Sequence, residues 1–139
     1  GGAELTYACD IRIATTTAVF GNPEPNLGIM AAAGASYRLP KLVGVSIAKQ
    51  VLLGARNLDA EQALRAGLVV EVTEPNCHVD AAHRLLDRIS RLSPLALRLT
   101  KIIVDAPGSH PFADDIAQAV LFESSDKRDR MTAFLEKKS

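Results

Sequence analysis

The stretch Gly1-Gly2-Ala3-Glu4-Leu5, followed closely by Phe20-Gly21-Asn22-Pro23-Glu24, decides how this chain folds and what it does. Two glycines lead into a helix-like run, and the first N–H groups of a helix have no partner inside it. The glycine backbone can therefore turn these N–H groups toward an anion or a polarised carbonyl. Glu4 and Glu24 add one carboxylate at each end of the stretch. Paired carboxylates beside backbone donors suit proton transfer next to a polarised carbonyl.

The composition is that of one ordinary globular domain rather than a disordered or fibrous chain. Of the 139 residues, 47% are hydrophobic and 23% are charged, which is the balance of a packed core with a polar surface. The 16 basic residues cancel the 16 acidic ones. No overall charge favours nucleic acid or an anionic membrane, so we expect neither as a partner.

The cysteines and histidines show no metal or disulfide pattern. Cys9 and Cys77 lie far apart without Cys-x-x-Cys spacing, and His78, His83 and His110 lack the spacing of metal ligands. We therefore expect no metal and no disulfide framework. A reducing compartment is the simplest interpretation. We expect the cytoplasm of a bacterium, with the mitochondrial matrix as the alternative. No segment reaches the roughly 18 apolar residues of a membrane span, and we expect no secretory leader.

Several short motifs follow one another along nearly the whole chain. They are Gly-Gly-Ala-Glu-Leu (1–5), Cys9-Asp10-Ile11, Phe-Gly-Asn-Pro-Glu (20–24), Leu27-Gly28, Arg38-Leu39, Leu58-Asp59-Ala60 with Ala63, Ala-Gly-Leu-Val (66–69) and Ala-Phe-Leu-Glu-Lys-Lys (133–138). In combination they resemble the enoyl-CoA hydratase/isomerase (crotonase) family. Their order and spacing are similar to those of its hydratase branch.

The resemblance implies an α/β fold of the crotonase kind. We expect residues 1–75 to form the C-terminal part of a crotonase-like β-β-α spiral with its active-site loops. Residues 76–139 are expected to form a helical region that makes trimers. In members of the family a further N-terminal half precedes this point, builds most of the sheet and supplies a second oxyanion N–H. We therefore expect these 139 residues alone to be inactive.

Local patterns predict the individual elements. Prolines on both sides of Glu24 predict a stiff loop without a helix across it, and Pro40 is expected to end a short helix that starts at Ala35. Asp59 with Gln62 resembles a capping box. Asp126 is expected to cap the last helix. The predicted helices are 3–8, 35–39, one that carries Ile47, Val51 and Leu52 and is closed by Gly54, one that follows Asp59 and is closed by Gly67, 79–92, 94–105 with Ser93 as its N-cap, 111–125 and 127–136. The predicted strands are 11–15 and 18–20, as a hairpin-like or corner pair, and 68–72.

Carried over by matching position, the resemblance assigns roles to five residues. Glu4 holds and activates the water, and Glu24 delivers a proton to the α-carbon of the substrate. Gly1 supplies one of two oxyanion N–H groups. Ala32 falls where a glycine N–H helps to hold the water, in a loop where members often have Pro-Gly-x-Gly-Gly. Lys137 faces the adenosine phosphates of CoA.

Simpler interpretations of the same residues remain open. Without the resemblance, Glu4 would be a surface charge at a helix start, worth about 0.3–1 kcal/mol. Gly1 would be a helix N-cap, and Lys137 would be a solvated cation at a helix C-terminus.

The activity that the resemblance implies is that of a 2-enoyl-CoA hydratase of fatty acid metabolism. Syn addition of water to a trans-2-enoyl-CoA gives a 3-hydroxyacyl-CoA, with no cofactor other than the CoA of the substrate. The implied assembly is a homotrimer or a dimer of trimers. The enzymatic alternative is a Δ3,Δ2-enoyl-CoA isomerase or another CoA-thioester lyase. The alternative from another class is a non-catalytic binding or RNA-contacting member.

Overall fold

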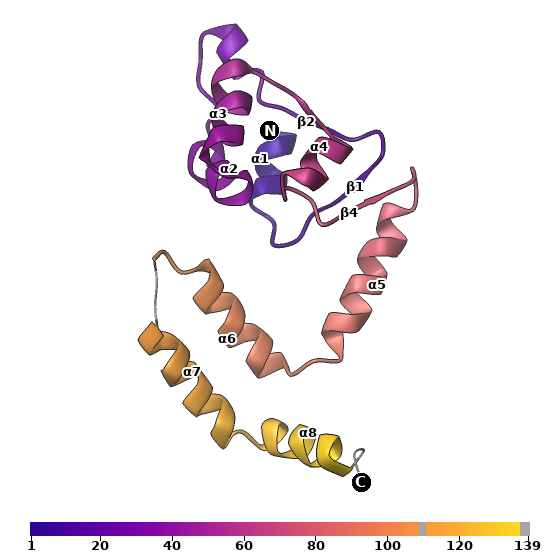
Figure 1. The fold of residues 1–139 in the computed structure, drawn as a ribbon, viewed down its shortest axis with the longest axis vertical. Coiled ribbons are helices and arrows are strands. Elements are labelled where there is room, and N and C mark those ends of the chain that lie inside the picture. Colours follow the sequence, from indigo (N-terminus) through magenta and orange to yellow (C-terminus); the bar gives the residue numbers. More distant parts are fainter. Residues whose placement is uncertain (109–110, 137–139) are drawn as a thin grey trace. The chain divides into compact units, whose positions relative to one another are not determined.

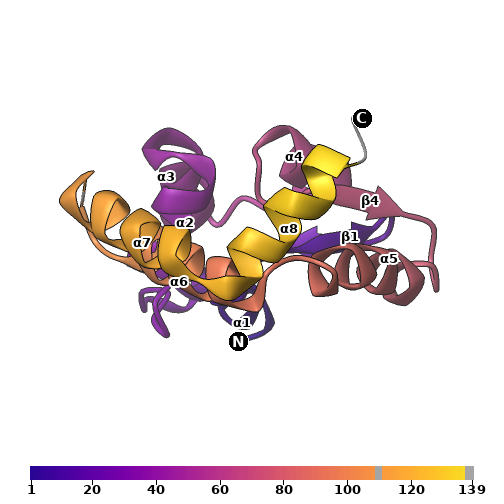
Figure 2. The same cartoon turned by 90° about the horizontal axis from the view of Figure 1, so that it is seen from below.

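The chain divides into two compact units, Gly1–Arg84 and Leu85–Ser139. The structure, a computed structural model, describes residues 1–108 and 111–136. Figures 1 and 2 show its helices and short strands from two directions. The strands that the structure describes all lie in the first unit, whereas the second unit is helical.

The first unit is built from short helices and four short strands. In chain order the elements are α1 (Gly2–Tyr7), β1 (Ile13–Thr15), β2 (Val19–Phe20), the 3-10 helix η1 (Glu24–Leu27), α2 (Ala35–Val43), α3 (Val45–Gly54), β3 (Leu58–Asp59), α4 (Ala60–Arg65) and β4 (Glu71–Thr73). Helix α5 (His78–Ser90) starts in this unit and ends in the next.

The four strands pair across long stretches of sequence. β1 lies parallel to β4, with Ala14 opposite Val72, and β2 lies antiparallel to β3, with Phe20 opposite Leu58. The hairpin alternative for residues 11–20 is therefore wrong, because β1 and β2 belong to different sheets. The strand predicted over 68–72 lies further toward the C-terminus in the structure, since β4 begins only at Glu71.

Both predictions that relied on prolines are wrong. A 3-10 helix begins at Glu24, with Pro23 as its N-cap. Prolines are tolerated there because the first N–H groups of a helix have no partner to lose. Helix α2 runs through Pro40 to Val43. An interior proline typically costs about 3 kcal/mol, and continuing the helix is what buries Val43, which is only 7% exposed.

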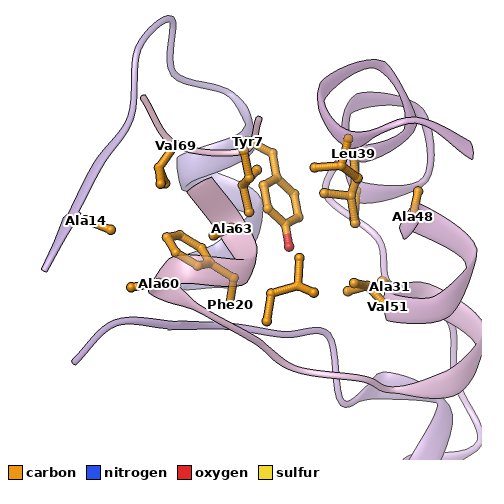
Figure 3. Close-up of a cluster of buried hydrophobic side chains, with 14 residues drawn as sticks. Tyr7, Ala14, Phe20, Ala31, Leu39, Ala48, Val51, Ala60, Ala63 and Val69 are labelled. Carbon is orange, nitrogen blue, oxygen red and sulfur yellow. The ribbon is translucent and has the colours of Figure 1, made fainter. Parts of the chain in front are cut away.

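The core of the first unit joins helices and strands from all along it. Figure 3 shows the packed cluster, which includes side chains from α1, α2, α3 and α4. Many of its members are alanines, so the elements approach one another closely. The predicted capping box at α4 is confirmed: Gln62 N donates to Asp59 Oδ1 at 2.7 Å, and Asp59 N donates to Gln62 Oε1 at 3.2 Å.

The second unit continues from α5 with three helices, α6 (Pro94–Asp105), α7 (Pro111–Glu123) and α8 (Ser125–Glu136). Ser93 caps α6 as its sequence indicates, since its Oγ accepts from Ala96 N at 3.4 Å. The predicted cap at Asp126 is wrong, because Ser124 Oγ accepts from Lys127 N at 3.2 Å instead. Over residues 1–108 and 111–136, no helix combines the length and the apolar character needed to cross a membrane.

Candidate active site

Glu4 is a buried carboxylate with two polar partners. It lies in the first turn of α1 and is only 5% exposed. Asn22 Nδ2 donates to Glu4 Oε1 at 2.7 Å, and the amino group of Gly1 lies 2.8 Å from Glu4 Oε2. Burying a carboxylate is costly unless it is paired in this way. The residue is therefore held in place from both sides.

The charge next to Glu4 favours its ionised form. The pKa of Glu4 is lowered, chiefly by the hydrogen bond with the amino group of Gly1, while burial acts in the opposite direction. The pKa of the Gly1 amino group is raised, first of all by the same hydrogen bond. In a chain that extends beyond Gly1, this nitrogen would be an uncharged amide N–H, so this part of the lowering depends on a free amino group.

Asn22 and Tyr7 extend the network into the core. Tyr7 Oη donates to Asn22 Oδ1 at 3.0 Å. Asn22 is completely buried, and Tyr7 is 3% exposed. Burial raises the pKa of Tyr7 to about 12, and the charges of Glu4 and Glu24 add to the effect. Two neutral groups thus connect the core to the Glu4 carboxylate.

Sequence reasoning did not single out either of these two residues. A signal for both was nevertheless present, because Asn22 lies inside the Phe-Gly-Asn-Pro-Glu motif and Tyr7 follows Glu4 at a spacing that puts both on one helix face. What the sequence could not supply is their contact, which joins α1 to the segment before η1.

Glu24 completes the site at the start of η1. Its charge helps to raise the pKa of the Gly1 amino group and that of Tyr7, and the proximity of Glu24 helps to lower the pKa of Glu4. Glu24 Oε2 is buried and has no hydrogen-bond partner among the residues that the structure describes. The structure therefore brings Glu4 and Glu24 together and leaves a buried acceptor beside them. A carboxyl pair of this kind can transfer protons to and from one small molecule.

Gly1 and Ala32, the other two predicted site residues that the structure describes, do not act together with the two carboxylates in an equally clear way. Gly1 nitrogen is turned to Glu4 in this structure. Ala32 is exposed in the turn before α2, where its carbonyl accepts from Ala35 N at 2.9 Å. In the described part of the chain, no hydrogen bond links Ala32 to Glu4 or Glu24. Their proposed roles in binding an oxyanion and a water remain predictions.

In the loop around Ala32, the strained backbone conformation lies at Ala33. Ala33 has a φ of 47°, in the left-handed region that costs a non-glycine residue about 1–2 kcal/mol. Gly34 follows with a φ of 90°, and a Cβ there would lie 1.9 Å from Arg38 Nη1. The φ of Gly34 favours glycine there, since the Arg38 side chain could move away from a Cβ, whereas Ala32 itself has no positive φ.

The remaining residues considered from the sequence are a lysine and the possible metal ligands. Lys137 and His110 lie outside the described residues. Within residues 1–108 and 111–136, no three His, Cys, Asp or Glu side chains gather as a metal site.

Known proteins similar to this chain include named hydratases. The chain is 40% identical to the short-chain-enoyl-CoA hydratase of Clostridium acetobutylicum, over 99% of the chain and 55% of that protein. It is 39% identical to the crotonyl-CoA hydratase of Syntrophomonas wolfei, with the same coverage of 99% and 55%. The chain thus spans about half the length of the curated relatives it matches.

Solved structures and the family model agree with these relatives. Pseudomonas aeruginosa DspI superposes with a TM-score of 0.92 at 38% identity, over 98% of this chain and 54% of that one. An enoyl-CoA hydratase from Bacillus anthracis gives a TM-score of 0.92 at 31% identity, over 98% and 55%. The predicted crotonase-like α/β fold with its helical region is confirmed. The model of the enoyl-CoA hydratase/isomerase family matches residues 1–139. The chain therefore belongs to the enoyl-CoA hydratase/isomerase family.

Proposed function

We propose that the whole protein carrying this chain is a 2-enoyl-CoA hydratase that converts a trans-2-enoyl-CoA into a 3-hydroxyacyl-CoA. The observation that carries the proposal is the convergence of Glu4 and Glu24 on one buried site. The bacterial relatives named short-chain-enoyl-CoA and crotonyl-CoA hydratases support the same reaction and substrate class.

The two carboxyls divide the proton transfers of the reaction. Glu4, as the carboxylate, binds the water and takes one of its protons while the water oxygen bonds to the β-carbon. The electron pair of the double bond moves toward the thioester, whose oxygen takes up the enolate charge. Glu24, as the acid, gives its proton to the α-carbon. Return of the proton from Glu4 to Glu24, directly or through a water molecule, restores the starting state.

The enolate charge needs donors at the thioester oxygen. We assign one of them to the backbone nitrogen of Gly1 and the other to a part of the protein outside this chain. Losing one such donor typically lowers the rate by about 10²–10³. The reaction needs no cofactor beyond the CoA of the substrate, and Lys137 is proposed to bind the CoA phosphates. The 139 residues alone are expected to be inactive, so measurable hydration by them would contradict this assignment.

A homotrimer, or a dimer of such trimers, is the proposed assembly. The support is the exposed apolar side chains of the second unit, among them Val104 and Phe112, each 75% exposed, and Leu135, 59% exposed. Exposed apolar side chains that form a contiguous patch are typical of an interaction site. Light scattering on the full-length protein tests the proposal, and a monomer at micromolar concentration would contradict it.

Crotonyl-CoA and the full-length protein give the direct test of the function. Hydration removes the absorbance of the conjugated enoyl thioester. We expect Glu24→Gln to lower kcat by about 10²–10⁴, the usual contribution of a general acid. The matched control is Glu61→Gln, which changes a carboxylate that is 82% exposed and paired with Arg65. Equal activity of Glu24→Gln and the wild type would overturn the proposed role.

The isomerase alternative is retained because the family that matches this chain includes isomerases. A 3-enoyl-CoA substrate distinguishes the two reactions. An isomerase would create the conjugated absorbance from this substrate and would leave crotonyl-CoA unchanged. A hydratase consumes crotonyl-CoA.

A further inference from the structure

We propose that Tyr7 is a positioning residue for the acid–base pair: its hydroxyl fixes the Asn22 amide with the NH2 end toward Glu4, which keeps Glu4 in its ionised form. The kinetic part of this proposal rests on the hydratase function proposed above. The effect on the proton equilibrium of Glu4 does not depend on any reaction.

The amide of Asn22 has two different ends, and only one of them suits a carboxylate. Its NH2 group donates to Glu4 Oε1 at 2.7 Å, and its carbonyl accepts from Tyr7 Oη at 3.0 Å. In the opposite orientation the amide carbonyl would face Glu4 Oε1. Two acceptors would then meet unless Glu4 carried a proton and donated it. The orientation of the amide is thus coupled to the protonation of Glu4.

Tyr7 selects between these two orientations. Asn22 is completely buried, so water does not compete for its carbonyl, and a buried carbonyl without a donor is costly. The hydroxyl of Tyr7 supplies this donor only when the amide carbonyl points toward it. The NH2 end must then point toward Glu4, where it stabilises the charged carboxylate.

The surroundings keep Tyr7 in the donor state and in one position. Burial raises the pKa of Tyr7 to about 12, so the hydroxyl retains its proton at neutral pH. Figure 3 shows the hydroxyl of Tyr7 turned into the middle of the buried cluster rather than outward. The other ionisable groups that act on Glu4 are the Gly1 amino group and Glu24. Tyr7 is the group that acts on Glu4 through Asn22.

Tyr7→Phe in the full-length protein is the test, because it removes the hydroxyl and keeps the buried ring. We expect the Glu4 pKa, followed by carboxyl ¹³C NMR, to rise by about half a unit or more. One unit corresponds to a tenfold change in the proton equilibrium. The acid limb of the kcat profile should move up by the same amount, with little change in KM. Tyr37→Phe, at a tyrosine that is 56% exposed, is the matched control and should change neither.

A second variant should change the Glu4 pKa in the opposite direction, which a folding defect would not do. Replacing Tyr7 with 3-fluorotyrosine keeps the ring and makes the hydroxyl a stronger donor, so the Glu4 pKa should move down. Movement in opposite directions in the two variants supports the proposal. An unchanged Glu4 titration in both overturns it. If the Glu4 shift appears but the wild type hydrates no enoyl-CoA, the hydratase assignment fails and the role of Tyr7 stands.

Discussion

The two units of the chain differ in whether they have a buried apolar core: the first unit has one, whereas α6, α7 and α8 contain no buried residue. In the first unit, Leu39 and Leu68 are completely shielded from solvent. In the second unit, Val104 on α6 and Phe112 on α7 are each 75% exposed. Both units contain well-formed helices, so helix formation is not what separates them.

The difference shows what each unit contributes. The candidate site needs a dry and rigid core, because Asn22 and Tyr7 keep Glu4 in place only where water does not compete for their hydrogen bonds. The helices of the second unit instead present apolar side chains that an isolated chain leaves in water. Their stability is therefore expected to depend on a partner surface, whereas that of the first unit is expected to depend on its own packing.

The largest expected effect comes from the core of the first unit. Leu39→Ala should lower the free energy of unfolding by about 2–5 kcal/mol, since it leaves a cavity at a fully buried position. The matched change in the second unit is Leu135→Ala, at a leucine that is 59% exposed, and it should cost about 0.5 kcal/mol or less. Urea unfolding followed by circular dichroism measures both, and equal losses would remove the distinction between the units.

Replacing an arginine should also lower the free energy of unfolding more in the first unit than in the second. Arg12 binds backbone carbonyls, with Nε donating to Leu68 O at 2.6 Å and Nη1 to Thr6 O at 3.4 Å. Arg12→Met should cost about 1.5–3 kcal/mol, because charged donors to carbonyls left without a partner contribute this much. Arg130→Met in α8 removes an exposed pair with Asp126 and an exposed hydrogen bond to Arg91 O at 2.9 Å. Because water can replace both, it should cost about 1 kcal/mol or less. The same urea titrations compare them, and a larger loss for Arg130→Met would contradict the expectation.

Acid should weaken the first unit through Glu4. The pKa of Glu4 in the folded chain is lowered from 4.5, so its contribution to stability is present above pH 4.5 and is lost as the pH falls through the lower folded value. Acetylating the amino group of Gly1 removes the main cause of the lowering. The acetylated 139-residue chain should therefore lose less stability between pH 4.5 and 3 than the free chain. Identical acid unfolding of the two forms would show that the pair with Gly1 has no effect.

The smallest expected effect concerns the loop before α2. Ala33→Gly relieves a φ of 47° but makes the unfolded chain more flexible. The two effects nearly cancel, and we expect a change of about 0–1 kcal/mol in favour of the variant. Thermal unfolding of the two proteins measures it. A clear loss of stability would mean that the methyl group of Ala33 packs more favourably than its strained backbone suggests.

The sequence by itself determined the family resemblance, the paired carboxylates and most helices. Elements with a local signal were predicted closely, such as the capping box at Asp59 and the α6 start at Ser93. These features depend on residues within one helical turn of each other. Their physical cause is therefore visible in a short stretch of sequence.

Only the tertiary structure decided the partners of the strands, the course of α2 through Pro40 and the network around Glu4. Each of these depends on contacts between distant residues, as when β1 finds β4 rather than β2. Packing against a core can outweigh the local cost of a proline, and a buried amide such as Asn22 takes its orientation from neighbours on other segments. A local pattern cannot contain these energies, because they arise only when the chain has closed on itself.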